Sequence, residues 1–138
     1  MTEAKDFHLK ESLASDLKQV NPFIDRVFEE LAQRVNAEEK LFRVKLALEE
    51  ALTNAMRHGN GLHHSRKVTV SISLKDNQIH LDIKDQGNGF NVKSVPDPTK
   101  DGYADTMPGG RGIFLMRTLM DEVEFYDNGR GVRMLKKL

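Results

Sequence analysis

The chain has 138 residues, which is the length of one ordinary domain and is enough to bury a substantial core. Its 21 Lys and Arg residues balance 21 Asp and Glu residues, so the composition gives no general attraction for nucleic acid or for an anionic membrane. The chain has no Cys, which excludes disulfides and thiolate chemistry, and without a secretory signal or an apolar run that spans a bilayer we expect a cytoplasmic protein.

The N-terminal part of the chain predicts a strand followed by a helix. A short first strand is expected within "KDFHLK", residues 5–10. Apolar residues spaced by three and four then predict an amphipathic helix over residues 15–33, with Ser15 as its N-cap. Pro22 lies inside this pattern, so either the helix bends there or it begins near Asn21.

A second amphipathic helix is predicted over residues 38–58, within which the stretch "EEALTNAMRHGNG" begins. Gly59 and Gly61 are expected to end it. Glu50 and Asn54 lie one turn apart on its polar side. Every amphipathic helix has a polar face, so this pair is either ordinary solvent-facing surface or a pair of oxygen ligands for a hard cation.

Alternating apolar residues predict two strands, over residues 68–74 and 79–83, joined as an antiparallel hairpin by the turn "KDNQ". Asp85 keeps the parity of the apolar residues, which would place its carboxylate on the buried face, where a charge without a donor is costly. Either the strand has already ended and Asp85 caps a turn, or Asp85 is an acceptor aimed into a pocket. In "DQGNGF", Gly87 and Gly89 permit positive φ and close approach of a ligand to the backbone.

Residues 90–112 predict a long loop, or lid, because they contain three of the four Pro residues and show little apolar periodicity. The segment "PGGRGIFLM" then leads into a short helix over residues 113–120. Free N–H groups at the start of a helix suit a phosphate, and Arg111 adds a positive charge between Gly110 and Gly112.

The C-terminal segment "DEVEFYDNGRGVRMLKKL" predicts two strands joined at Asp127, Asn128 and Gly129, a typical hairpin signal. The order is therefore helix, helix, two strands, long loop, helix and two strands. This order predicts one α+β domain over residues 1–138, a two-layer sandwich of one mixed, largely antiparallel sheet with helices on one face.

Together these motifs resemble the GHKL ATP-binding superfamily, whose Bergerat ATPase fold is then expected here. "LALEEALTNAMRHGN", "DQGNGF" and "GGRGIFLMRTLMDEVEF" are similar to the three motifs of its anti-sigma-factor serine kinases, the RsbW group. The resemblance covers the chain from about Ser15 to the C-terminus. The last strand departs from it, because "GVRMLKK" stands where relatives often show Gly-Thr, and no site residue is predicted there.

The resemblance implies ATP and Mg²⁺ as the bound cofactors and gives a role to each residue of the first two motifs. Asn54 would coordinate the Mg²⁺ that bridges the phosphates, and Glu50 would be the general base that takes the proton of the attacking hydroxyl. Asp85 would accept a hydrogen bond from the adenine amino group, and Gly87 and Gly89 would shape the base pocket.

For the third motif, the resemblance implies that Gly110 and Gly112 let the lid approach the phosphates. Arg111 would contact either the γ-phosphate or a partner protein. His58 is expected to be structural, and His63 and His64 are expected to lie in a solvated loop.

The function implied by the resemblance is that of an ATP-dependent protein serine/threonine kinase that acts as an anti-sigma factor. Such a kinase phosphorylates a small antagonist of the STAS type and then sequesters a sigma factor, commonly as a homodimer formed by its N-terminal strand and helix. One alternative is a regulatory switch that binds ATP and partner proteins without phosphorylating them. Another is an ATPase fragment of a larger machine, which would hydrolyse ATP without modifying a protein.

Overall fold

The computed structural model describes residues 5–89 and 110–138, with the side chains of residues 110 and 111 excepted. The predicted lid therefore lies largely outside the described residues, and so do any side-chain contacts of Arg111. In chain order the elements are β1 (Phe7–Ala14), the 3-10 helix η1 (Leu17–Gln19), α1 (Val20–Ala32), α2 (Glu38–Asn54), the π-helix η2 (Ala55–Gly59), β2 (Lys67–Lys75), β3 (Gln78–Lys84), α4 (Gly110–Leu119), β4 (Glu122–Tyr126) and β5 (Gly131–Lys137).

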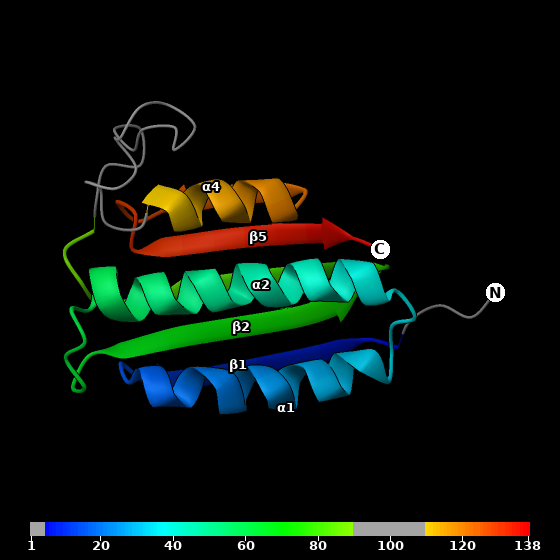
Figure 1. Ribbon diagram of the computed structural model, residues 1–138, viewed down its shortest axis with the longest axis horizontal. Helices are drawn as coiled ribbons and strands as arrows, with labels where there is room; N and C mark the ends of the chain where they lie inside the picture. The colour runs from blue at the N-terminus through cyan, green and yellow to red at the C-terminus, as the bar shows by residue number, and fades with distance from the viewer. Residues whose placement is uncertain (1–4, 90–109) are drawn as a thin grey trace.

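The described strands form one five-stranded sheet with the order β1-β2-β3-β5-β4. The predicted α+β sandwich is confirmed, because α1, α2 and α4 all lie on one face of this sheet (Figure 1). All four strand pairings of the described sheet are antiparallel. Asp76 and Asn77, in the two-residue turn between β2 and β3, both have positive φ, which is the geometry of a type I′ hairpin.

The first strand and the helix cap of the N-terminal segment differ from the sequence prediction. β1 is longer than the predicted strand, and Ser15 does not cap a helix because its hydroxyl is buried and donates to the Arg66 carbonyl at 2.8 Å. The N-cap is Asp16, whose carboxylate accepts from the Lys18 N–H at 3.0 Å at the start of η1. Pro22 lies in the first turn of α1, where its missing N–H has no intrahelical partner to lose.

The hydrophobic core lies between the sheet and the three helices. α2 is the central helix and packs between α1 and α4 (Figure 1). The alternating residues of β3, Ile79, Leu81 and Ile83, are buried, as their period predicts. No helix in the described part of the chain is long and apolar enough to cross a membrane.

A fully buried side chain, that of Asn60, ties the end of the helical segment to the ends of three strands. Its Nδ2 donates to Ser15 Oγ at 2.8 Å, just after β1, and to the carbonyl of Lys67 at 3.1 Å, at the start of β2. Its Oδ1 accepts from the Gln86 N–H at 2.8 Å, just after β3. A buried amide whose hydrogen bonds are all made fixes the relative positions of the segments it joins.

We expect Asn60→Ala to lower the free energy of unfolding by at least about 2 kcal/mol, because it leaves several buried polar groups without partners. Urea denaturation followed by circular dichroism measures this loss. The matched control is Asn21→Ala, an exposed amide in α1, which we expect to change the same quantity by no more than about 0.5 kcal/mol. Equal effects of the two substitutions would contradict the role given to Asn60.

Candidate functional site

The C-terminal turns of α2 carry Glu50 and Asn54, and both side chains are half-buried rather than turned to open solvent. Gly112, in the first turns of α4, lies against both of them. A Cβ atom at Gly112 would be 2.6 Å from Asn54 Nδ2 and 2.9 Å from Glu50 Oε2. The fold therefore brings together three predicted site residues from two motifs that are distant in the sequence.

The start of α4 adds hydrogen-bond donors to this cluster. The first N–H groups of a helix have no partner within the helix, and the helix dipole gives that end a partial positive charge. Because Gly112 has no side chain, the first turns of α4 lie directly against the polar groups of Asn54 and Glu50. An anion such as a phosphate suits this position.

Burial raises the pKa of Glu50, and the neighbouring charge of Glu49 raises it further. A carboxylate whose pKa is raised holds a proton more readily than an ordinary surface carboxylate. This is the property that a general base needs near neutral pH.

The hydrogen-bond pattern of the helix changes directly after Asn54. Residues Ala55–Gly59 form a π-helical turn, in which the Asn60 N–H donates to the Ala55 carbonyl at 2.8 Å. Wide turns of this kind often occur at functional sites because they change the direction of the following backbone. Here the change leaves Gly59 in contact with Asp85 of the neighbouring sheet segment.

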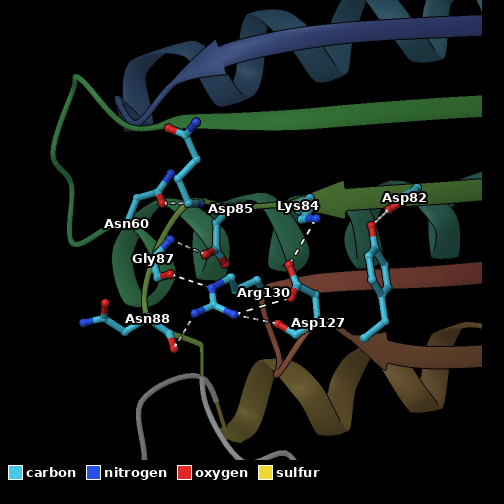
Figure 2. Close-up of polar contacts among 10 residues, drawn as sticks. Asn60, Asp82, Lys84, Asp85, Gly87, Asn88, Asp127 and Arg130 are labelled. Atoms are coloured by element: carbon cyan, nitrogen blue, oxygen red, sulfur yellow. Dashed lines mark hydrogen bonds and ion pairs between the residues drawn. The ribbon is translucent and has the colours of Figure 1, made fainter.

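Asp85 is only 7% exposed and lies one residue beyond β3. Its N–H donates to the Arg130 carbonyl at 2.9 Å, so strand-like pairing continues to this residue and its side chain keeps the parity of the core. Its Oδ1 accepts from the Gly87 N–H at 2.8 Å, as Figure 2 shows. Among the described residues no donor bonds to Oδ2. Asp85 therefore caps the turn with one oxygen, as the first alternative expects, and its other oxygen has no donor among the described residues; that this oxygen faces a ligand pocket stays a prediction.

Burial is the main cause of the raised pKa of Asp85, and the charge of Asp127 adds to it. The Gly87 N–H, and the positive charges of Arg130 and Arg66, act in the opposite direction and favour the ionised form. The balance is a carboxylate that would gain from a donor supplied by a ligand.

The backbone approaches Asp85 closely from two sides. A Cβ atom on Gly59 would collide with Asp85 Oδ2, and a Cβ atom on Gly87 would collide with the Gly59 carbonyl. Gly89 has φ +79° and lies against the backbone of Asn128. The predicted pocket glycines Gly87 and Gly89 thus both lie in the loop that follows Asp85. At each of the two positions a side chain would collide with neighbouring atoms.

The sequence did not indicate Gly59, Asn60 and Arg130 as site residues. Gly59 was assigned only the end of a helix, although its place in the first motif, five residues after Asn54, was a usable signal. Arg130 follows the predicted hairpin turn and donates to the loop carbonyls after Asp85, a contact that no local pattern reveals. His63 and His64 are exposed, as expected for a solvated loop, whereas His58 is also exposed and its structural role stays a prediction.

The residues of the cluster fit a magnesium ion that arrives with phosphates. Asn54 and Glu50 offer amide and carboxylate oxygens, which are the ligands that hard cations prefer. Within the described ranges, no group of three or more His, Asp or Glu side chains converges to hold a metal by protein ligands alone. Mg²⁺ commonly takes one or two protein ligands and completes its coordination with phosphate and water, so this donor set suits it.

Comparison with known proteins gives a consistent result over most of the chain. Residues 13–136 match the family described as histidine kinase-like ATPase domain. The chain is 32% identical over 104 residues to the anti-sigma F factors of Clostridium perfringens and Anoxybacillus flavithermus, which covers 72% of this chain and 74% and 71% of theirs. It is 33% identical over 104 residues to the serine-protein kinase RsbW of Bacillus licheniformis, which covers 69% of this chain and 63% of that protein.

We expect Gly112→Ala to preserve the fold but to impair the cluster. Ala is favoured over Gly inside a helix by about 1 kcal/mol, yet its Cβ would push aside the side-chain ends of Asn54 and Glu50. A displacement of about 1 Å in such groups costs on the order of 10²-fold in activity. Gly112→Ala should therefore keep the melting temperature in thermal denaturation but lose ATP-dependent activity. Thr118→Ala, an exposed change in the same helix, should alter neither quantity.

We expect Asp85→Asn to increase the stability of the ligand-free protein at neutral pH. The raised folded-state pKa means that protonated Asp85 favours folding, and that this contribution is lost as the pH rises through that pKa. Asn stays neutral and avoids this loss, so the variant should have the higher free energy of unfolding in urea denaturation at neutral pH. The difference from the wild type should shrink as the pH falls toward 3.8. Asp127→Asn should instead lower the free energy of unfolding at neutral pH, because Lys84 lowers the pKa of Asp127. A change of the same sign in both variants would refute the raised pKa of Asp85.

Proposed function

The chain belongs to the histidine kinase-like ATPase domain family, and from this membership we propose that it is an ATP-dependent protein serine/threonine kinase that acts as an anti-sigma factor. One observation carries the assignment of its site. The end of the helical segment formed by α2 and η2 contacts two polar centres at once: through Asn54 and Glu50 it meets the start of α4, and through Gly59 it meets Asp85. A nucleotide has the same two parts, a phosphate chain and a base.

The centre at Asp85 is proposed to bind adenine. The Oδ2 of Asp85, to which no described donor bonds, accepts a hydrogen bond from the amino group of the base, and Gly59 and Gly87 let the backbone lie close to this carboxylate. Guanine has a carbonyl where adenine has this amino group, so it would set one acceptor against another. Because guanine would leave this buried acceptor unpaired, the site should favour adenine over guanine by several kcal/mol.

The centre at Asn54 is proposed to bind the phosphates. The first N–H groups of α4 donate to phosphate oxygens, and Gly110 and Gly112 let the phosphates lie close to the backbone. Mg²⁺, when bound by Asn54, supplies neutralisation of phosphate charge and orients the γ-phosphate. Arg111 stands between the two glycines and contributes a positive charge either to the γ-phosphate or to the bound partner.

Glu50 is proposed to activate the acceptor hydroxyl. It takes the proton of a serine or threonine hydroxyl, whose oxygen bonds to the γ-phosphorus while the bond to the β,γ-bridging oxygen breaks and ADP leaves. The half-buried position of Glu50 and its raised pKa suit this task. Catalysis then depends on positioning and on charge neutralisation, as in other phosphoryl transfers.

The proposal extends to partners and to place of action. The acceptor residue belongs to a small antagonist of the STAS type, and its phosphorylation frees the kinase to hold a sigma factor in the cytoplasm. A homodimer formed by the N-terminal strand and helix accords with the position of β1, which is an edge strand of the described sheet.

The test of this function uses Glu50→Gln. We expect this variant to bind ATP with nearly unchanged affinity but to transfer phosphate to the antagonist about 10²–10⁴ times more slowly, which is the usual contribution of a general base. The antagonist is first captured from a cell extract with and without ATP, then purified for assays with labelled ATP. Glu38→Gln is the matched control, because Glu38 is an exposed carboxylate in the first turn of the same helix, away from Glu50.

The outcomes of this test separate the candidate functions. Transfer by Glu50→Gln at the wild-type rate would remove Glu50 from the chemistry. A wild-type protein that binds ATP and its partners but transfers no phosphate would be a binding switch. ATP hydrolysis without protein phosphorylation would indicate an ATPase instead of a kinase.

A further inference from the structure

The turn between β4 and β5 packs against the loop that follows β3. Asp127, Asn128 and Gly129 have φ values of 51°, 56° and 82°, and this left-handed run turns the chain tightly into Arg130. The Arg130 carbonyl accepts from the Asp85 N–H at 2.9 Å. The turn is therefore held in register with the last residue of the β3 segment, directly beside the buried carboxylate.

The side chain of Arg130 joins the turn to the loop. Its Nε donates to the Gly87 carbonyl at 2.7 Å, and its Nη2 donates to the Asn88 carbonyl at 3.3 Å. Its Nη1 donates to the Asp127 carbonyl at 3.2 Å, as Figure 2 shows. One rigid, planar guanidinium thus contacts two successive carbonyls of the loop and one of the turn, which only an Arg side chain can do at once.

Two further contacts hold the same two segments together. A Cβ atom on Gly89 would collide with the Asn128 carbonyl, so loop and turn meet backbone to backbone at this point. On the other side of Asp85, Lys84 Nζ forms an ion pair with Asp127 Oδ2 at 3.1 Å. The turn is consequently fixed to the chain both before and after the carboxylate.

We propose that Arg130 is a positioning residue of the base pocket, whose guanidinium holds the loop of residues 85–89 in the shape that presents the Asp85 carboxylate to adenine. The inference rests on the proposed function, because it names the residue that prepares its base-binding centre. A loop with two glycines loses more conformational entropy on ordering than most segments. A loop already ordered by Arg130 does not incur that cost when the ligand binds.

The charge of Arg130 acts on Asp85 in the same direction. Arg130 and Arg66 favour the ionised form of Asp85, whereas burial and the charge of Asp127 oppose it. Ionised Asp85 is an acceptor at both oxygens, and one oxygen is already used by the Gly87 N–H. Removing the Arg130 charge would therefore disturb both the shape and the protonation state of the pocket.

Arg133 provides an internal comparison for this role. It lies on β5, three residues after Arg130, but its guanidinium is 3.9 Å from the centre of the Tyr126 ring and 3.6 Å from Asp82, on the face of the sheet away from the helices. It contacts none of the loop carbonyls. A general contribution of the β4–β5 hairpin to stability would thus be shared by both arginines, whereas a contribution to the pocket belongs to Arg130 alone.

The experiment compares Arg130→Met, Arg130→Lys and Arg133→Met by calorimetric titration with Mg²⁺-ATP and Mg²⁺-GTP. We expect Arg130→Met to reduce the ATP-to-GTP affinity ratio by about tenfold, the scale of one lost hydrogen bond, and to change GTP affinity little. Arg130→Lys should fall between it and the wild type, because an ammonium group reaches fewer of the carbonyls. Arg133→Met should keep the wild-type ratio.

The pH dependence of ATP affinity is a second readout that a purely structural role would not change. Because Arg130 lowers the pKa of Asp85, its loss should make Asp85 protonate at higher pH. The pH below which ATP affinity declines should then be higher in Arg130→Met than in the wild type and in Arg133→Met. Gly89→Ala disrupts the contact from the loop side and should lower the ATP-to-GTP ratio without removing any charge.

A wild-type preference for ATP that survives in both Arg130→Met and Gly89→Ala would overturn this inference and leave the proposed function standing. A wild-type protein that binds ATP and GTP equally would overturn the adenine assignment together with it. Melting temperatures of the ligand-free variants identify a global loss of folding. A reduced ratio in Arg130→Lys, which retains the charge, is then the deciding evidence for the geometry of the guanidinium.

Discussion

The structure depends on one constraint, which is the close approach of the backbone at Gly59 and Gly87 to the buried carboxylate of Asp85. Both positions require glycine, because a Cβ atom on Gly59 or Gly87 would collide with its surroundings. This close approach brings the end of the helical segment directly against the end of β3. Asn60, the next residue, is then forced into the interior, and its three hydrogen bonds with the strand ends make that burial stable.

The helical segment from α2 to Gly59 serves both parts of the candidate site. Its regular turns present Glu50 and Asn54 to the start of α4, and its final π-helical turn leads to Gly59 beside Asp85. Because both centres lie at one end of the rigid central helix, their separation is fixed by the core. A rigid element of this kind favours binding of a ligand that contacts both centres.

The hairpin that carries Arg130 is fixed from both faces of the sheet. On the side away from the helices, the Tyr126 hydroxyl donates to Asp82 Oδ1 at 2.5 Å, and burial together with this acceptor raises the pKa of Tyr126 to about 12. Arg133 covers the same ring. On the side of the site, Arg130 bonds to the loop, so the hairpin links a surface cluster to the pocket and gains rigidity from both.

The sequence by itself determined most of the elements and indicated the candidate residues of the site. The periods of its apolar residues predicted the helices, the two hairpins and the buried parity of Asp85, because burial on one side imposes a repeat on local sequence. The glycines in "DQGNGF" and in "PGGRG" indicated the two glycine-rich segments of the candidate site. Only the tertiary structure decided that Gly112 meets Asn54, that Gly59 meets Asp85 and that Arg130 holds the loop after it. These contacts join segments far apart in the chain, and their geometry follows from how helices and sheet pack, which no local repeat encodes.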